Sequence, residues 1–256
     1  MISRDYLNGL FGLAGKRALV TGASRGLGLA FSQALASADA HVVLAGRSEV
    51  PLLEAVERLR SDGADVSHVV LDVTDTASVD DAVRAAGAVD VLVNNAGIQQ
   101  RGPLEQFTDD DWRRIMSTNV DGVFRTSRAV VKGMIVRGKG AIINVSSVQS
   151  LLARPSIGPY AAAKGAVGML TKSMAGEWGQ YGIRVNALAP GYFRTDLNAA
   201  LTTDADFSKW LSGRTPMRRW GEVKELAGAL VFLASDAASF VTGQTVFVDG
   251  GITSVL

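Results

Sequence analysis

The segment RALVTGASRGLG, residues 17–28, decides the fold of this chain. Apolar residues lead up to Thr21, three glycines lie among the next seven residues, and a helix-forming stretch follows. Glycines at such a junction let the backbone turn sharply and approach a pyrophosphate, whose charge the amides at the helix amino terminus then stabilise. A glycine cluster also occurs in ordinary turns, but its place between strand and helix favours dinucleotide binding.

The same alternation of short apolar runs and longer helical stretches continues to the carboxyl end of the chain. Strands are predicted at Arg17–Thr21, His41–Ala45, Val66–Leu71, Val89–Val93, Ala141–Ser146, Arg184–Leu188 and Thr245–Val248. Helices are predicted at Gly26–Ala38, Pro51–Ser61, Thr76–Ala86, Asp109–Val136, Tyr160–Tyr181 and Glu222–Ser235. This order predicts an α/β fold, a doubly wound parallel sheet with helices on both faces, because most of the strands read as continuous apolar runs.

The size of the chain sets its organisation. At 256 residues one buried core is sufficient, so we predict a single domain over residues 1–256. The stretch 191–221 interrupts the alternation with two tryptophans and several arginines. It is predicted to be a loop that covers the substrate.

Composition excludes several classes of function. The chain has no cysteine, and His41 and His68 each adjoin a valine-rich run, so both are predicted to be structural and no metal site is expected. A net charge of +1 provides no general attraction for nucleic acid or an anionic membrane. Without a recognisable signal or membrane-spanning segment, the protein is expected to be soluble and cytoplasmic.

The end of the second predicted strand bears on the choice of cofactor. In the NAD-binding pattern an acidic residue about 20 positions beyond the glycines binds the ribose hydroxyls. Here that place reads AGRS, residues 45–48, and Arg47 and Arg25 suit a 2′-phosphate instead. NADP(H) is therefore predicted, although Arg47 could also simply solvate the strand end. Asp72 is predicted either to bind adenine or to cap a helix.

Small and amide-bearing residues end the fourth predicted strand as NNAG, residues 94–97. Ligands bind at this carboxyl edge in open α/β folds, while Asn94 could instead tie neighbouring strands together. The full set predicted to bind the dinucleotide is Gly22, Ser24, Arg25, Gly26, Leu27, Gly28, Arg47, Asp72, Val73, Asn94, Ala96, Gly97, Tyr160, Lys164, Pro190, Gly191 and Thr195.

A proton-transfer group is predicted where Ser147 follows the fifth strand and Tyr160 and Lys164 share one helix face. A tyrosine has a pKa of about 10, so we expect the Lys164 ammonium to lower the pKa of Tyr160. Ser147 is expected to hold the substrate oxygen against Tyr160, and Asn119 to anchor a water beside Lys164. Tyrosine and lysine four apart is a common pattern, but here it occurs together with the nucleotide turn.

Together these motifs resemble the short-chain dehydrogenases/reductases over Lys16 to Gly251. The resemblance also rests on Pro190-Gly191 and on VDGG, residues 248–251. It implies a Rossmann fold, hydride transfer at C4 of a nicotinamide, catalytic roles for Asn119, Ser147, Tyr160 and Lys164, and a homotetramer.

Further segments resemble the gluconate 5-dehydrogenase subfamily, which interconverts D-gluconate and 5-keto-D-gluconate. They are GIQQR at 97–101, SVQS at 147–150, PYAAAKGAV at 159–167, and RTP and RWG at 214–216 and 219–221. Residues expected to touch substrate are Arg101, Ser147, Gln149, Arg154, Tyr160 and Tyr192, since arginine suits a carboxylate and glutamine suits hydroxyls. Trp210 is expected to pack on the sheet edge or, with Tyr192, to close over the sugar.

Three alternatives share these motifs. A 3-oxoacyl-carrier-protein reductase has the same pattern, but the positions of its carrier-docking arginines align with Gly138 and Tyr181 here. Reductases of other keto sugars are also close. A non-catalytic NADP(H) sensor is disfavoured because Ser147, Tyr160 and Lys164 are all present.

Overall fold

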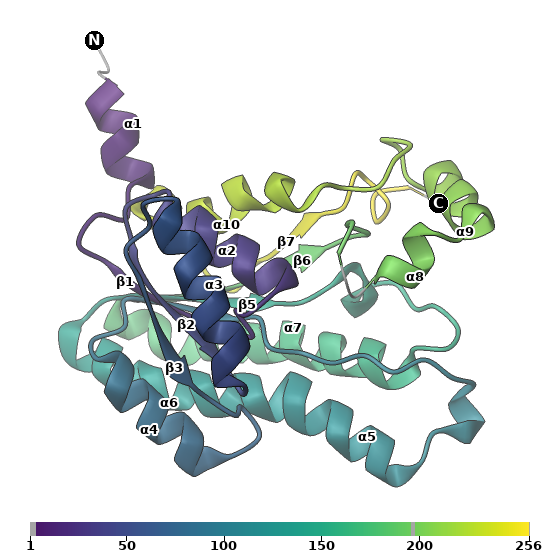
Figure 1. Cartoon of the computed structure of the whole chain (residues 1–256), viewed down its shortest axis with the longest axis horizontal. Helices are drawn as coiled ribbons and strands as arrows, with labels where there is room; N and C mark the ends of the chain where they lie inside the picture. Colours follow the sequence, from purple (N-terminus) through teal and green to yellow (C-terminus); the bar gives the residue numbers. More distant parts are fainter. Residues whose placement is uncertain (1–3, 196–197, 256) are drawn as a thin grey trace.

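The computed structural model describes residues 4–195 and 198–255, and among these residues seven parallel strands form one sheet (Figure 1). The strand order is β3-β2-β1-β4-β5-β6-β7. Their bounds are β1 Arg17–Thr21, β2 His41–Gly46, β3 Val66–Val70, β4 Val91–Asn94, β5 Gly140–Val145, β6 Ile183–Pro190 and β7 Thr245–Val248. The predicted doubly wound sheet is confirmed, with strand ends shifted by one or two residues.

The helices are α1 Arg4–Phe11, α2 Gly26–Ala36, α3 Glu49–Ser61, α4 Thr76–Ala86, α5 Asp109–Met116, α6 Gly122–Arg137, α7 Gly158–Trp178, α8 Ala199–Thr202, α9 Ala205–Arg214 and α10 Ala227–Ala234. Helices α2, α3 and α10 cover one face of the sheet and α4, α6 and α7 cover the other, while α1, α8 and α9 lie outside these layers (Figure 1). Shorter turns are η1 Leu104–Gln106, η2 Ser117–Asp121, η3 Val148–Ser150, η4 Gly179–Tyr181, η6 Val223–Leu226 and η7 Asp236–Ala238.

Each face of the sheet has its own apolar core, because successive strand residues point to opposite faces. Ala18 and Val20 of β1 pack with Phe31 of α2 and with residues of α3 and α10. Leu19, between them, packs on the other side with Met134 of α6 and with residues of α4 and α7. This double burial explains the continuous apolar runs in the strand sequences.

The predicted helix Asp109–Val136 is wrong as a single element. It is interrupted by η2, a π-helical segment between α5 and α6. A Cβ on Gly122, which begins α6, would lie 2.9 Å from Val73, so this helix passes very close to the segment after β3. The wider π turn also directs Asn119 into the interior, where it is fully buried.

The predicted loop 191–221 is also not simply irregular. It contains α8 and α9, while its positions 196–197 lie outside the described residues. The Asp204 side chain accepts a hydrogen bond from the Phe207 backbone N–H at 2.9 Å and so caps the start of α9. The predicted helix Glu222–Ser235 likewise begins as η6 before α10.

The remaining boundaries differ little from those predicted. Helix α2 ends two residues early, α3 begins two residues early, and the predicted helix Tyr160–Tyr181 is α7 followed by η4. His41 begins β2 and its ring contacts Asp65 at 2.9 Å, while His68 lies in the middle of β3. Among the described residues, no helix combines the length and apolar character needed to cross a bilayer.

Candidate active site

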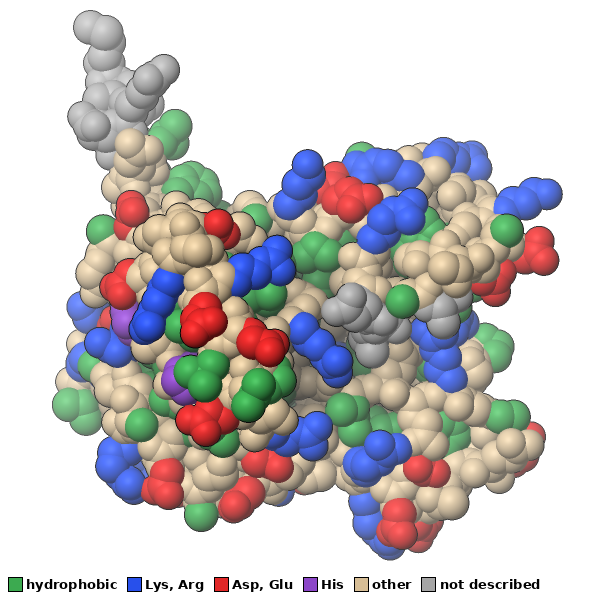
Figure 2. Space-filling view, in the orientation of Figure 1, with side chains coloured by type: hydrophobic (Ala, Val, Ile, Leu, Met, Phe, Trp, Pro, Cys, Tyr) green, Lys and Arg blue, Asp and Glu red, His purple; other side chains and the backbone are tan. Residues whose placement is uncertain are grey.

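A cavity of about 760 Å³ opens at the carboxyl ends of the strands, where the strand order reverses between β1 and β4. All the predicted cofactor and substrate residues except Asn94 line it, as do Ser147, Tyr160 and Lys164. Lys and Arg side chains lie around the hollow at the centre of the face seen in the space-filling view (Figure 2). The sequence motifs therefore meet at one place.

The glycine turn after β1 forms one wall of the cavity. A Cβ on Gly28 would lie 2.2 Å from the Gly22 carbonyl oxygen, so only glycine permits this crossing of the backbone. Gly26 has a φ of +56°, and no atom lies within 4 Å of a Cβ built on it. Helix α2 begins here with no side-chain hydrogen bond to its first amides. These free N–H groups suit a pyrophosphate.

Beyond the turn, two guanidinium groups border the far end of the cavity. Arg25 and Arg47 are both exposed, and neither takes part in an ion pair with any described residue. They supply donors and positive charge, and so they fit a 2′-phosphate.

Asp72 has a different role from the helix cap considered for it. Asp75 caps α4, whereas Asp72 accepts hydrogen bonds from the backbone N–H and hydroxyl of Thr74 at 2.8 and 2.7 Å. Burial alone would raise the pKa of Asp72, but the Thr74 hydrogen bonds and the charges of Arg47 and Arg125 outweigh it and lower the pKa. Asp72 is therefore an ionised acceptor at the cavity wall.

The two predicted asparagines lie behind the cavity wall. Asn94 donates to the Asn144 side chain at 2.9 Å and to Ser127 at 2.8 Å, and so it ties β4 to β5 and α6. Asn119 pairs with the backbone of Ile98, accepting from its N–H and donating to its carbonyl, both at 2.8 Å. These two bonds hold the Ile98 backbone with one donor and one acceptor of the Asn119 amide, and the expectation that Asn119 anchors a water beside Lys164 stays a prediction.

Ser147, Tyr160 and Lys164 lie together in the wall of the cavity. Ser147 and Tyr160 share a side-chain hydrogen bond. The Lys164 Nζ donates to the Val145 carbonyl at 2.6 Å and lies 5.6 Å from the centre of the Tyr160 ring. The helix α7 and the end of β5 hold the three groups in this arrangement.

The net lowering expected for the pKa of Tyr160 is not found, because burial outweighs it. Burial raises the pKa of Tyr160 to about 12, although the Ser147 hydrogen bond acts in the opposite direction. Burial also lowers the pKa of Lys164 to about 8. The Lys164 ammonium is directed to the Val145 carbonyl and to the Tyr160 ring. Desolvation of the phenol therefore determines the direction in which the Tyr160 pKa shifts. The tyrosine is therefore held protonated at neutral pH.

A donor-rich end of the cavity lies next to these groups. Arg154 and Arg101 interact with one another and with Tyr192, and burial together with the like charge of Arg154 lowers the pKa of Arg101. Burial raises the pKa of Tyr192, while Arg154 opposes this by its charge and by a side-chain hydrogen bond. Two cations and a phenol close together, with no carboxylate among these partners, suit a bound anion.

Aromatic rings cover this end of the cavity. Tyr192 packs against Phe207, Trp210 and Trp220 with ring centres 5.6 to 6.3 Å apart. The Arg154 guanidinium lies 5.2 Å from the centre of the Phe207 ring. Trp210 is 47% exposed and stacks on this cluster, so the expectation that it packs on the sheet edge is wrong.

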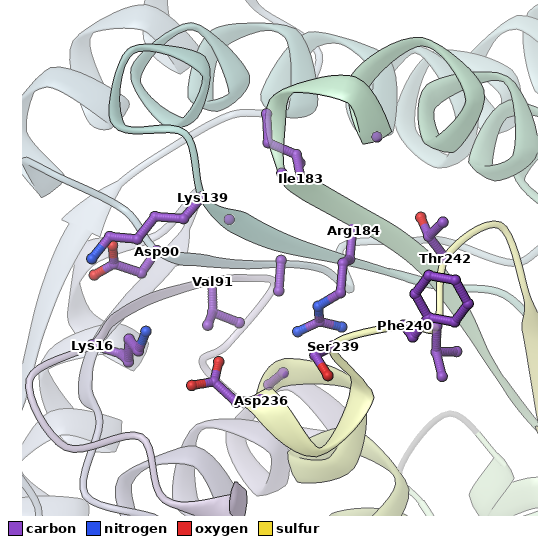
Figure 3. A pocket seen from close by; sticks show the side chains of 16 residues that line it. Lys16, Asp90, Val91, Lys139, Ile183, Arg184, Asp236, Ser239, Phe240 and Thr242 are labelled. Carbon is purple, nitrogen blue, oxygen red and sulfur yellow. The ribbon is translucent and has the colours of Figure 1, made fainter.

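A second cavity, of about 450 Å³, lies at the opposite, amino ends of the strands (Figure 3). Arg184 lines it and donates to the backbone carbonyls of Leu233 and Ser235 at 2.7 and 3.0 Å. None of the residues predicted to bind cofactor or substrate lines this cavity. The candidate active site is therefore the cavity at the carboxyl edge.

Some residues of the active-site cavity were not predicted from the sequence. They include Asn95, Ile98, Thr118, Ile157, Phe193 and Leu201. Asn95 donates to the backbone carbonyls of Thr21 and Gly22 at 2.9 and 3.1 Å, and its place in the NNAG motif was a usable signal. Thr118 reaches the cavity through η2, whose π-helical geometry has no evident sequence pattern.

A family model described as enoyl-(acyl carrier protein) reductase, of the short-chain dehydrogenase/reductase type, matches residues 22–253. The chain belongs to the short-chain dehydrogenase/reductase family. Membership in this family agrees with the sheet order and with the glycine turn at the strand edge.

Several relatives of this short-chain dehydrogenase/reductase match it along nearly its whole length. Gluconate 5-dehydrogenase of Gluconobacter oxydans (strain 621H) is 54% identical, covering 95% of this chain and 97% of that protein. The 5-keto-D-gluconate 5-reductase of Escherichia coli (strain K12) is 43% identical over 96% and 98%. A gluconate 5-dehydrogenase from Burkholderia cenocepacia J2315, crystallised with NADP and tartrate, has a TM-score of 0.95 and 53% identity over 98% and 100%. The predicted resemblance to this subfamily is confirmed.

Proposed function

We propose that this chain is an NADP(H)-dependent oxidoreductase that interconverts D-gluconate and 5-keto-D-gluconate. The observation that carries the proposal is that Tyr160, Ser147 and the arginine pair Arg101 and Arg154 line one cavity. Tyr192 interacts there both with Tyr160 and with the two arginines. A proton donor beside a cation pair suits a ketone that also carries a carboxylate. The names of the full-length relatives support the same reaction.

Residues along the cavity would hold NADP(H). The amides at the start of α2 would bind the pyrophosphate, Arg25 and Arg47 the 2′-phosphate, and Asp72 the adenine amino group. Val73, Ala96, Gly97, Pro190, Gly191 and Thr195 would contact the remaining parts of the cofactor. The bound nicotinamide supplies or accepts a hydride at its C4 position.

Tyr160 is the proposed general acid for ketone reduction. Because its pKa is raised to about 12, the phenol is protonated at neutral pH and can give its proton to the developing alkoxide. Ser147 would donate a second hydrogen bond to the same oxygen and fix it beside Tyr160. The Lys164 ammonium, held by Val145, would stabilise the phenolate that remains. Asn119 would act indirectly, by holding the Ile98 backbone at the cavity wall.

The donor-rich end of the cavity is the proposed site of the substrate carboxylate. Arg101 and Arg154 would form charge-assisted hydrogen bonds with it, and an anion there would relieve their mutual repulsion. Tyr192 would close this end from the side of the aromatic cluster. Neutral polyols lack the carboxylate that these arginines would bind.

The remaining properties of the protein are also predictions. We propose that residues 1–256 act as a single catalytic domain, with 191–221 as the segment that covers the substrate. A homotetramer is proposed from the family resemblance, and sedimentation analysis of the purified protein tests it. A cytoplasmic location is proposed from the sequence features described above.

The product of the reverse reaction tests the proposed function. Purified enzyme is incubated with NADP⁺ and D-gluconate, and the keto acid formed is identified by NMR. Formation of 5-keto-D-gluconate is expected. Formation of another keto acid, or oxidation of galactitol at a comparable rate, would reject the proposed substrate while retaining the enzyme class.

A further inference from the structure

Gln149 carries a side-chain carbonyl oxygen, Oε1, that is buried and has no hydrogen-bond partner among the described residues. Gln149 lies in η3, two positions after Ser147, and lines the active-site cavity. Buried acceptors in folded proteins are nearly always satisfied by protein, water or ligand. The other two buried atoms without a partner in the described part of the chain belong to Arg137 and Arg214, which do not line this cavity.

The rest of Gln149 is held firmly. Its backbone N–H donates to the Ser147 Oγ at 3.2 Å, and its side-chain Nε2 donates to the Tyr192 hydroxyl at 3.3 Å. One end of the residue is therefore attached to the proposed reaction centre and the other to the proposed carboxylate site. The Oε1 atom belongs to the same side-chain carboxamide as Nε2.

The neighbouring groups determine which ligand atom can satisfy this oxygen. Neither Arg101 nor Arg154 donates to Oε1, and the Tyr192 hydroxyl receives the Gln149 amide and a hydrogen bond from Arg154. A ketone and a carboxylate present only acceptors, so neither can pair with Oε1. In a keto sugar acid, the hydroxyl groups are the donors.

We propose that Gln149 Oε1 accepts a hydrogen bond from the substrate hydroxyl next to the reacting carbonyl, and that it selects for hydroxy ketones. The inference rests on the proposed function, in which this group is the C4 hydroxyl of 5-keto-D-gluconate. With the carbonyl at Ser147 and the carboxylate at Arg101 and Arg154, the carbon chain passes Gln149, and C4 is the first carbon that it presents.

The same contact opposes substrates that lack this hydroxyl. The carbon between the ketone and the thioester of a 3-oxoacyl thioester is a methylene, which would leave Oε1 buried and unpaired. A site with a buried hydrogen-bonding group strongly rejects an analogue that lacks the matching hydroxyl. An apolar pocket rejects an analogue with an added hydroxyl less strongly. Gln149 thus separates a keto sugar acid from a 3-oxoacyl thioester.

The test compares kcat/KM for 5-keto-D-gluconate and its 4-deoxy analogue in the native enzyme and three variants. The native enzyme is expected to prefer the hydroxylated substrate by about 10- to 100-fold, the range for one buried unpaired polar group. Gln149→Met should bring this ratio close to one, while Gln149→Glu, which keeps an acceptor, should retain most of it. Gln106→Met makes the same exchange at an exposed glutamine outside the cavity and should leave the ratio unchanged.

Thermal melting and NADPH fluorescence establish that each variant folds and binds cofactor. An equal loss of kcat/KM for both substrates in Gln149→Met would overturn the inference, because a glutamine that merely supports Tyr192 affects both alike. If the native enzyme does not reduce 5-keto-D-gluconate, the proposed function fails. The inference is then decided on acetoin and butanone, which differ by the same hydroxyl: a preference for acetoin lost in Gln149→Met supports it, and an unchanged ratio rejects it.

Discussion

The Nζ of Lys164 lies 2.6 Å from the carbonyl oxygen of Val145, the last residue of β5. This contact directs the buried ammonium toward the end of the strand that leads to Ser147. Because burial lowers the pKa of Lys164 to about 8, its charge is complete only below that pH. The charge that would stabilise the Tyr160 phenolate therefore disappears within an accessible pH range.

The first prediction concerns the pH dependence of ketone reduction. We expect kcat/KM to be level below pH 8 and to fall as pH rises above it, since deprotonation of Lys164 removes the charge. Tyr160, with a pKa near 12, stays protonated over this range. Lys164→Arg should be slower but should lose the decline between about pH 8 and 10, because arginine does not deprotonate there. The same decline in the arginine variant would assign it to another group.

The second prediction concerns the proton donor. Tyr160→Phe should lower kcat by about 10²- to 10⁴-fold, the usual contribution of a positioned acid, while the Kd for NADPH stays nearly unchanged. Stopped-flow reduction and fluorescence titration measure the two quantities. Turnover at the native rate would mean that another group delivers the proton.

The third prediction concerns the choice between NADPH and NADH. Arg47→Asp should raise the Kd for NADPH by about 10- to 100-fold, since a charge-assisted contact is lost and a repulsion is added. The Kd for NADH should change little. Arg58→Asp, an exposed arginine on α3, provides the control for the change in net charge. An equal change with both cofactors would show that Arg47 does not contact the 2′-phosphate.

The fourth prediction concerns the buried amide pair Asn94 and Asn144. Asn94→Leu should destabilise the fold by about 2–3 kcal/mol, because Asn144, Ser127 and Thr126 lose a buried partner. The double variant Asn94→Leu/Asn144→Leu should lose less free energy of unfolding than the two single variants lose together, as expected for groups in one network. Urea unfolding gives these values, and strict additivity would argue against the network.

The fifth prediction concerns the ion pair of Arg219 and Glu225, next to Trp220 of the aromatic cluster. Glu225 accepts from Arg219 at 2.6 and 2.7 Å and from the Glu222 backbone N–H at 2.7 Å, and these contacts lower the pKa of Glu225 to about 2. A lowered carboxyl pKa stabilises the folded state above about pH 4.5, and this stabilisation is lost as pH falls toward 2. The difference in Tm between the native protein and Glu225→Gln should therefore be constant near neutrality and shrink in acid. A difference independent of pH would contradict this.

The fold was predictable because the features that determine it are local. The apolar run and glycines of residues 17–28 specify a strand, a tight turn and a helix without reference to the rest of the chain. The motifs of the site were predictable for a related reason. They follow strand ends, and the carboxyl ends of parallel strands meet at one edge.

Other features depend on tertiary structure. The π turn around Asn119 arises where α6 passes Val73, and no residue pattern near it differs from that of an ordinary helix. The direction of the Tyr160 pKa shift was missed because charge spacing is visible in the sequence and desolvation is not. Helix α9 did have a signal, since Asp204 precedes an apolar spacing from Phe207 to Leu211, but the aromatic and arginine content of the segment suggested a loop.

The most direct test of the central claim follows NADPH absorbance after addition of 5-keto-D-gluconate to the purified enzyme, with an acetoacetyl thioester and NADH in parallel reactions. The proposed function predicts rapid oxidation of NADPH with the keto sugar acid, slow oxidation of NADH, and little reaction with the thioester. Reaction with the thioester alone would retain the fold and the proton donor but contradict the proposed substrate, and equal rates with NADH and NADPH would contradict the role of Arg47.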